Sequence, residues 1–182
     1  QPLGAAVGNA LEVAEALRVL RNQPLAGPER RFEMLCLQLA RNTLRAAGVE
    51  ADPEAMLRSG KALAKAEAWF EAQGARAMDP QVQALTETPV SAPASGYLAK
   101  LDAGAVGELV LDLGGGRRRK EDQVDLQVGV VVNKTVGEPV QAGEPVVTIK
   151  SRAPLASGVV DRFKRDAIVI SAAAALPQCL FL

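Results

Sequence analysis

The sequence contains no histidine and only two cysteines, and each shortage limits the kinds of catalytic or metal site that the chain can form. Without histidine, the chain lacks the commonest general base and the commonest metal ligand. Any catalysis must therefore use carboxylates, lysine, arginine or backbone amides. Cys36 and Cys179 match no zinc or redox spacing, so we expect both to be reduced packing residues.

The chain has balanced charge and no long apolar run. Its 21 basic and 21 acidic side chains balance, which gives no support for a nucleic-acid or anionic-membrane partner. No apolar run approaches the roughly 20 residues that a membrane helix needs, and no signal peptide is evident. We therefore expect a soluble globular protein of one or two domains, located by default in the cytoplasm.

Helical periodicity dominates the first half of the sequence. Apolar spacing and capping residues predict helices within residues 9–20, 29–48, 51–57 and 59–74, with a short helix at 79–85. In residues 29–48, Phe32, Leu35, Cys36 and Leu39 share one face, and further apolar residues lie beside it. A helix apolar over so much of its circumference is predicted to be buried.

The residue types change near position 86. The stretch "TETPVSAPASGYL" mixes proline, serine and threonine, and valine and glycine dominate the segments after it, so we place a domain boundary there. Strands are predicted within residues 96–101, 127–134, 145–150, 158–160 and 167–171. The segment 108–113, "ELVLDL", fits a helix or a strand.

A glycine-rich segment followed by basic residues, "LGGGRRRKEDQVD", is the densest charged stretch. Glycine amides with Arg117, Arg118, Arg119 and Lys120 could hold a phosphate. The segment lacks the context of a P-loop, however, and acidic residues follow at once. A solvated, salt-bridged turn and an anion or inter-domain contact both stay open.

The rhythm of valine and glycine in "VGVVVNKTVGEPVQAGEPVVTIK" is typical of the barrel-sandwich modules that carry biotin or lipoate. Such a carrier needs its modified lysine at an exposed hairpin tip, within flanking residues that the carrier families share. Neither Lys134 in "NKT" nor Lys150 in "IKS" has those neighbours. We therefore expect neither lysine to be modified.

Two glutamates of the first predicted helix, Glu12 and Glu15, are three residues apart and share a face. They could bind a cation or act as acid and base. The plain alternative is that both are solvated near the start of a helix, where negative charge is favourable.

Four segments together resemble the C-terminal part of the pyrimidine-nucleoside and thymidine phosphorylases. They are "QPLGAAVGNALEVAEAL", "SGKALAKAEAWFEAQG", the long run from "SGYLAKLDAG" to "GEPVVTI", and "DAIVIS". The resemblance implies an α+β chain, in which residues 1–85 are the helical part of a catalytic α/β domain. Residues 86–182 would form a small antiparallel β-rich, barrel-sandwich-like C-terminal domain.

The same resemblance implies an activity for the complete protein, namely a pentosyltransferase that uses phosphate as co-substrate. It converts a pyrimidine nucleoside reversibly to the free base and a pentose 1-phosphate, and it is expected to be a homodimer. The residues that grip phosphate and base in that family lie upstream of this sequence. We therefore assign no catalytic or substrate-binding residue here and expect the chain alone to be inactive.

The resemblance also implies one cation site within this chain. The family holds a monovalent cation, usually potassium, with two backbone carbonyls and a glutamate of the opening motif, which correspond to Leu3, Ala6 and Glu15. Carbonyl oxygens can replace the water shell of such a cation, and the glutamate adds negative charge. Two other interpretations remain: a non-catalytic barrel-sandwich carrier or scaffold, and a fragment with no independent role.

Overall fold

In the computed structural model, residues 1–75, 78–80 and 85–174 can be described. Four helices come first: α1 (Asn9–Leu20), α2 (Gly27–Ala46), α3 (Pro53–Arg58) and α4 (Lys61–Ala72). The helix predicted at 79–85 falls largely outside the described residues. No helix in the described part of the chain is long and apolar enough to cross a membrane.

Local sequence explains the ends of these helices. The carboxylate of Asp52 accepts a hydrogen bond from the Glu54 amide, and Pro53 occupies the first helical turn. Gly48, at φ 67°, follows the end of α2. At the start of α4, Gly60 is the N-cap.

Two antiparallel sheets form the second half of the chain. One has the strand order β1-β4-β6-β2, with β1 at Ala6–Val7, β2 at Thr86–Ser91, β4 at Gly129–Val132 and β6 at Pro145–Ser151. The other has the order β5-β3-β7, with β3 at Gly96–Leu101, β5 at Pro139–Val140 and β7 at Ile168–Ser171. The predicted α+β class with an antiparallel β-rich half is confirmed.

Two further helices cover this β-rich half. One settles a segment that the sequence left ambiguous, and the other replaces a predicted strand. The ambiguous segment 108–113 belongs to α5 (Ala103–Asp112), which Asp102 caps by accepting from the Ala105 amide. The predicted strand at 158–160 is wrong, because it lies in α6 (Ser157–Ala167). Val159, Val160, Phe163 and Ala167 recur at helical spacing, and the three-residue window was too short to show that period. The stretch at 86–91, where the sequence places the domain boundary, is strand β2.

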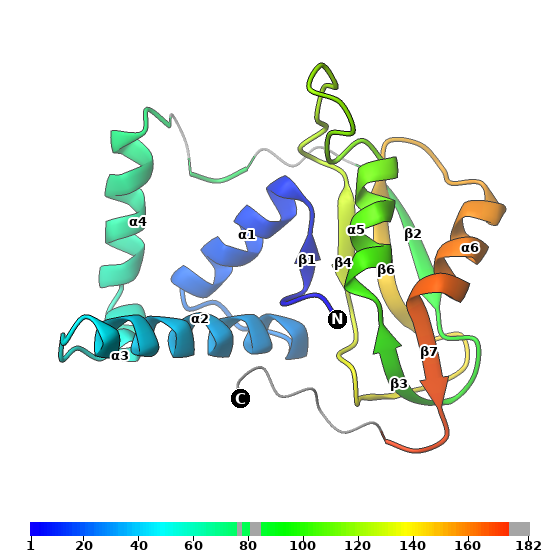
Figure 1. Cartoon of the computed structure of the whole chain (residues 1–182), viewed down its shortest axis with the longest axis horizontal. Coiled ribbons are helices and arrows are strands. Elements are labelled where there is room, and N and C mark those ends of the chain that lie inside the picture. The colour runs from blue at the N-terminus through cyan, green and yellow to red at the C-terminus, as the bar shows by residue number, and fades with distance from the viewer. Residues whose placement is uncertain (76–77, 81–84, 175–182) are drawn as a thin grey trace.

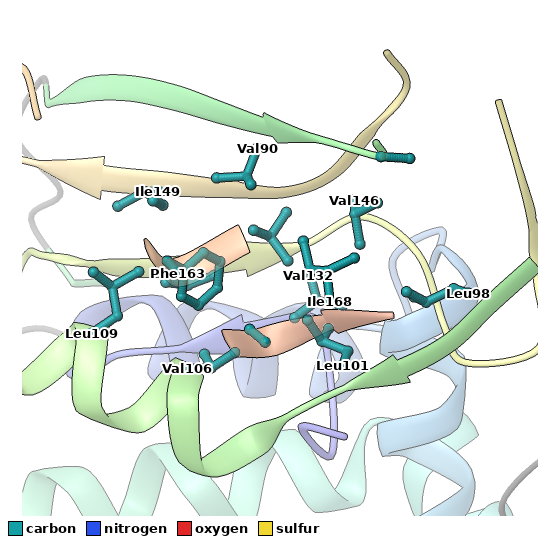
Figure 2. Packing of buried hydrophobic residues seen from close by; sticks show 14 of the residues in the cluster. Val90, Leu98, Leu101, Val106, Leu109, Val132, Val146, Ile149, Phe163 and Ile168 are labelled. Atoms are coloured by element: carbon teal, nitrogen blue, oxygen red, sulfur yellow. The ribbon is translucent and has the colours of Figure 1, made fainter. Parts of the chain in front are cut away.

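One hydrophobic core fills the space between the two sheets and these helices. Figure 2 shows Val90, Ile149, Phe163 and Ile168 converging from β2, β6, α6 and β7. Leu98, Leu101 and Val106 within the same cluster are fully buried. None of the residues of this core cluster lies in α1, α2, α3 or α4.

The opening segment joins the helical half to the β-rich half. Strand β1 precedes α1 along the chain yet pairs with β4, so that it lies between the two in Figure 1. Gly8 makes this close approach possible: its φ is 141°, and a Cβ there would lie 2.6 Å from the carbonyl oxygen of Val128. Residues 6–7 therefore contribute a strand to a sheet of the second half. The domain boundary at residue 86 stays a prediction.

Burial along α2 differs from what the sequence pattern predicts. Leu35 is buried, but Leu39 is 52% exposed and Met34 is 62% exposed. The expectation of a buried helix is therefore wrong for this chain as it stands. In the described residues, nothing covers that part of the helix surface.

Candidate cation site at the opening segment

The side chain of Glu15 is folded back onto the segment that precedes its own helix. Its Oε1 accepts a hydrogen bond from the Ala5 amide at 2.6 Å, and its Oε2 accepts one from the Ala6 amide at 3.1 Å. Only 6% of the residue is exposed. The solvated interpretation is therefore wrong for Glu15, whereas Glu12 is exposed.

The backbone next to Glu15 is shaped to admit the carboxylate. A Cβ built on Gly4 would lie 2.5 Å from Oε1 and 2.7 Å from Oε2 of Glu15, closer than real contacts allow. The glycine at position 4 thus creates a cradle that any other side chain would fill. Sequence reasoning missed Gly4, although it falls between the predicted ligands Leu3 and Ala6.

Leu3, Ala6 and Glu15 line one cavity of about 250 Å³, together with Gly4 and Phe32 among others. The structure therefore brings the three predicted ligands together at one place. Much of the remaining lining comes from α1, α2 and the start of α5, so that elements far apart in sequence close the cavity.

Arg31 of α2 is the second contact that the sequence did not reveal. Its Nη1 donates to the carbonyl oxygen of Pro2 at 2.6 Å and to that of Leu3 at 3.3 Å. Burial lowers the pKa of this guanidinium from its ordinary value. No local pattern marks Arg31, because the contact joins residues 28 and 29 positions apart.

The electrostatics of the carboxylate follow from its burial. Removal from water raises the pKa of Glu15 above its ordinary value, and the two amide hydrogen bonds oppose that shift. Glu29 and Glu12 raise it further, because like charges disfavour ionisation. A cation beside Glu15 would compensate a buried negative charge that, among the described residues, accepts hydrogen bonds from the amides of Ala5 and Ala6.

The residues present suit a weakly hydrated monovalent cation, because the available donors are oxygen atoms around a buried carboxylate. In the part of the chain that the structure describes, no three acidic, cysteine or histidine side chains gather around one point. A cation here would thus rely on the carbonyls of Leu3 and Ala6 beside Glu15. It would have to share the Leu3 carbonyl with Arg31 or displace that guanidinium.

The glycine- and arginine-rich segment forms ion pairs and hydrogen bonds with nearby acidic residues. The Arg118 guanidinium pairs with Glu108 and Asp112, at 3.1 and 2.7 Å. The backbone amides of Arg118 and Arg119 both donate to Oδ2 of Asp122. These contacts favour the salt-bridged turn over an anion-binding loop.

The two lysines considered as carrier positions also form ion pairs. The Lys134 ammonium lies 2.6 Å from Oε1 of Glu144, and Lys150 pairs with Glu87. Lys150 lies within β6 and Lys134 follows β4. Neither contact favours the carrier interpretation.

Comparison with known proteins gives the class to which this domain is related. Residues 97–171 match the family model described as "Pyrimidine nucleoside phosphorylase C-terminal domain". This match covers β3 to β7 and helices α5 and α6.

The curated relatives extend the similarity over nearly the whole chain. It is 34% identical over 191 residues to the pyrimidine-nucleoside phosphorylase of Bacillus subtilis, covering 99% of this chain and 43% of that protein. It is 42% identical over 154 residues to the thymidine phosphorylase of Mycobacterium tuberculosis H37Rv, covering 84% and 35%. For the pyrimidine-nucleoside phosphorylase of Geobacillus stearothermophilus the identity is 39% over 165 residues, covering 83% and 37%.

These matches confirm the resemblance to the C-terminal portion of the pyrimidine-nucleoside and thymidine phosphorylases. The chain spans less than half the length of each of these relatives.

Proposed function

We propose that this chain is the C-terminal portion of a pyrimidine-nucleoside phosphorylase. In the reaction, an oxygen of hydrogen phosphate attacks C1′ of the sugar, the bond between C1′ and the base nitrogen breaks, and the base leaves with the proton that the phosphate gives up. The products are the free pyrimidine and a pentose 1-phosphate. The observation that carries this proposal is the similarity to the Bacillus subtilis enzyme over 99% of the chain.

Within that reaction, we place the phosphate and base contacts in the portion of the relatives for which this chain has no counterpart. Phosphorolysis needs an anion cradle, donors for the charge that develops on the leaving base, and alignment of both partners. In the densest basic stretch among the described residues, the Arg118 guanidinium is already paired with Glu108 and Asp112. We therefore propose that the chain alone is inactive. From the family resemblance we also propose that the complete enzyme is a cytoplasmic homodimer.

The contribution of this chain is the cation site. Potassium would be held by the carbonyl oxygens of Leu3 and Ala6 and by the Glu15 carboxylate, with further groups from the portion that holds phosphate. When bound, the cation supplies positive charge next to that portion. Glu15 itself holds the opening segment through the amides of Ala5 and Ala6, and so fixes where the two carbonyls lie.

A chimeric enzyme tests the activity. The matched portion of the Bacillus subtilis protein is replaced by this chain, and base release from uridine and thymidine is followed with phosphate present. We expect turnover in the ordinary enzyme range, about 1 to 1,000 per second, and none from the chain alone. Turnover by the purified chain alone would overturn the placement of the site, and a folded but inactive chimera would overturn the proposed activity.

The cation is tested in the same chimera. Glu15→Gln removes the charge and keeps the size of the side chain, so the potassium concentration for half-maximal activity should rise by about tenfold or more. Glu71→Gln is the matched control, because Glu71 is an exposed carboxylate of α4. Identical potassium dependence in wild type and Glu15→Gln would remove Glu15 from the site.

A further inference from the structure

The opening segment is held by two ionic side chains that bind its backbone at different points. The Glu15 carboxylate accepts hydrogen bonds from two backbone amides at the end of this segment. The Arg31 guanidinium of α2 donates to two backbone carbonyls at its start, those of Pro2 and Leu3. Within residues 2–6, backbone donors therefore face the anion and backbone acceptors face the cation.

Arg31 makes these contacts without a carboxylate partner among the described residues. Arg18 and Arg58, by contrast, each pair with a glutamate at 2.7 Å. Carbonyl oxygens are the groups that replace water around a weakly hydrated cation. The partly buried Arg31 guanidinium thus uses the opening segment in the way that a bound cation would.

The carbonyl oxygen of Leu3 is the point where the two uses overlap. It is one of the three proposed ligands of potassium, and it also accepts from Nη1 of Arg31 at 3.3 Å. Two positive charges at one oxygen repel each other, and partial burial strengthens the repulsion because it lowers the effective dielectric constant. The contact of Arg31 with the Pro2 carbonyl is shorter, at 2.6 Å, so the guanidinium can release Leu3 and keep Pro2.

We propose that Arg31 is a built-in competitor of the monovalent cation at the Leu3 carbonyl. Without potassium, Arg31 satisfies this oxygen and keeps the opening segment in place. When potassium binds, the guanidinium withdraws to the Pro2 carbonyl. The affinity for potassium is therefore lower than Glu15 and the two ligand carbonyls would give without Arg31. This inference rests on the proposed function for the presence of the cation, and in it Arg31 is a positioning residue.

The test measures how strongly potassium stabilises the chimera when Arg31 is changed. Thermal unfolding is followed in potassium chloride and in choline chloride at equal ionic strength, so that screening is the same in both. Arg31→Gln removes the charge, and its midpoint in choline chloride should lie below that of wild type because a contact is lost. The potassium concentration for half of the rise in midpoint should fall by about tenfold. At the same potassium concentration, the rise should be about twice that of wild type.

Arg30→Gln is the matched control. Arg30 is exposed and donates to the carbonyl of Leu25, outside the opening segment. The same charge is thus lost from the same turn of α2, and a general electrostatic effect would appear in both variants. We expect Arg30→Gln to keep the wild-type response to potassium.

The 182-residue chain, measured in the same two salts, is the second protein in the test. Potassium should raise the midpoint of its Arg31→Gln variant more than that of wild type, although the portion that holds phosphate is missing. The chimera decides the inference where it folds, and the chain decides it where the chimera does not.

A response to potassium in Arg31→Gln that is equal to or weaker than that of wild type would overturn the inference, because Arg31 would then only support the segment. An equal gain in Arg30→Gln would overturn it as well. The proposed function is judged separately. An inactive chimera that shows the expected gain contradicts the activity alone, and an active chimera whose potassium dependence needs Glu15 but ignores Arg31 contradicts this inference alone.

Discussion

Removing the Glu15 carboxylate should loosen the opening segment by an amount that the structure allows us to estimate. Glu15→Ala leaves the amides of Ala5 and Ala6 without their acceptor, in a region where Glu15 itself is only 6% exposed. Each buried donor left unsatisfied costs about 1–3 kcal/mol. Partial access of water to the cavity reduces the sum, so we expect a loss of about 2–4 kcal/mol, or roughly 5–12 °C in the midpoint of thermal unfolding.

Glu15→Gln should cost less, because the amide oxygen can still accept from one of the two backbone amides. Its effect should also depend on pH. Burial raises the pKa of Glu15 above its ordinary value of 4.5, so the folded chain favours the neutral form more than the unfolded chain does. The stability from this preference is fully present below the unfolded pKa and is lost as pH rises through the folded pKa. Because the Gln side chain does not titrate, the gap between wild type and Glu15→Gln should narrow as pH rises above about 4.5.

Thermal unfolding followed by far-ultraviolet circular dichroism, between pH 4 and pH 8 without potassium, measures both effects. Glu71→Ala provides the control for loss of an exposed helix carboxylate, with an expected change within about 0.5 kcal/mol. The reasoning would be refuted if Glu15→Ala were as stable as Glu71→Ala. A gap between wild type and Glu15→Gln that widens with pH would contradict the raised pKa.

Three further predictions concern other contacts. Gly4→Ala should destabilise the chain by about 1–3 kcal/mol, because the new methyl group meets the Glu15 carboxylate, and it should cost clearly less in a Glu15→Ala background; a double-mutant cycle by chemical denaturation measures the coupling. Asp102→Ala should lower the unfolding midpoint of the chain at neutral pH, because Asp102 pairs with Lys100 and caps α5; these contacts lower its pKa to about 2, so the difference from wild type should vanish as pH falls towards that value. After co-expression with biotin and lipoate ligases, intact mass spectrometry should find no mass gain on Lys134 or Lys150, and a gain on either would revive the carrier interpretation.

Much of the fold could be predicted from local pattern. The helices α1 and α2 and the strands β3, β6 and β7 carry a clear apolar period over enough residues. The errors occur where the window is short or the residues are unusual for their element. Strand β2 contains Pro89 and two threonines and resembles a linker, and only its pairing with β6 makes it a strand.

The candidate site could be predicted in part. The resemblance pointed to Leu3, Ala6 and Glu15, and the structure places them around one cavity, although their role as ligands stays a prediction. Composition alone favoured a solvated Glu15, because nothing in a helical repeat reveals that the side chain folds back onto the preceding segment. The contacts of Gly4 and Arg31 depend on how α2 crosses that segment, which is a property of tertiary structure.

The geometry of the opening segment couples the candidate site to the β-rich half. Ala5 donates its amide to Glu15 and accepts, through its carbonyl, from the amide of Val132 at the end of β4. Ala5 is therefore one of the residues that link helix α1, the opening segment and the first sheet. Any change that charges, neutralises or compensates Glu15 acts on Ala5 and so on the pairing of β1 with β4. Because β1 has only two residues, it adds little pairing energy of its own, and we expect its position to depend on this carboxylate as well as on the sheet.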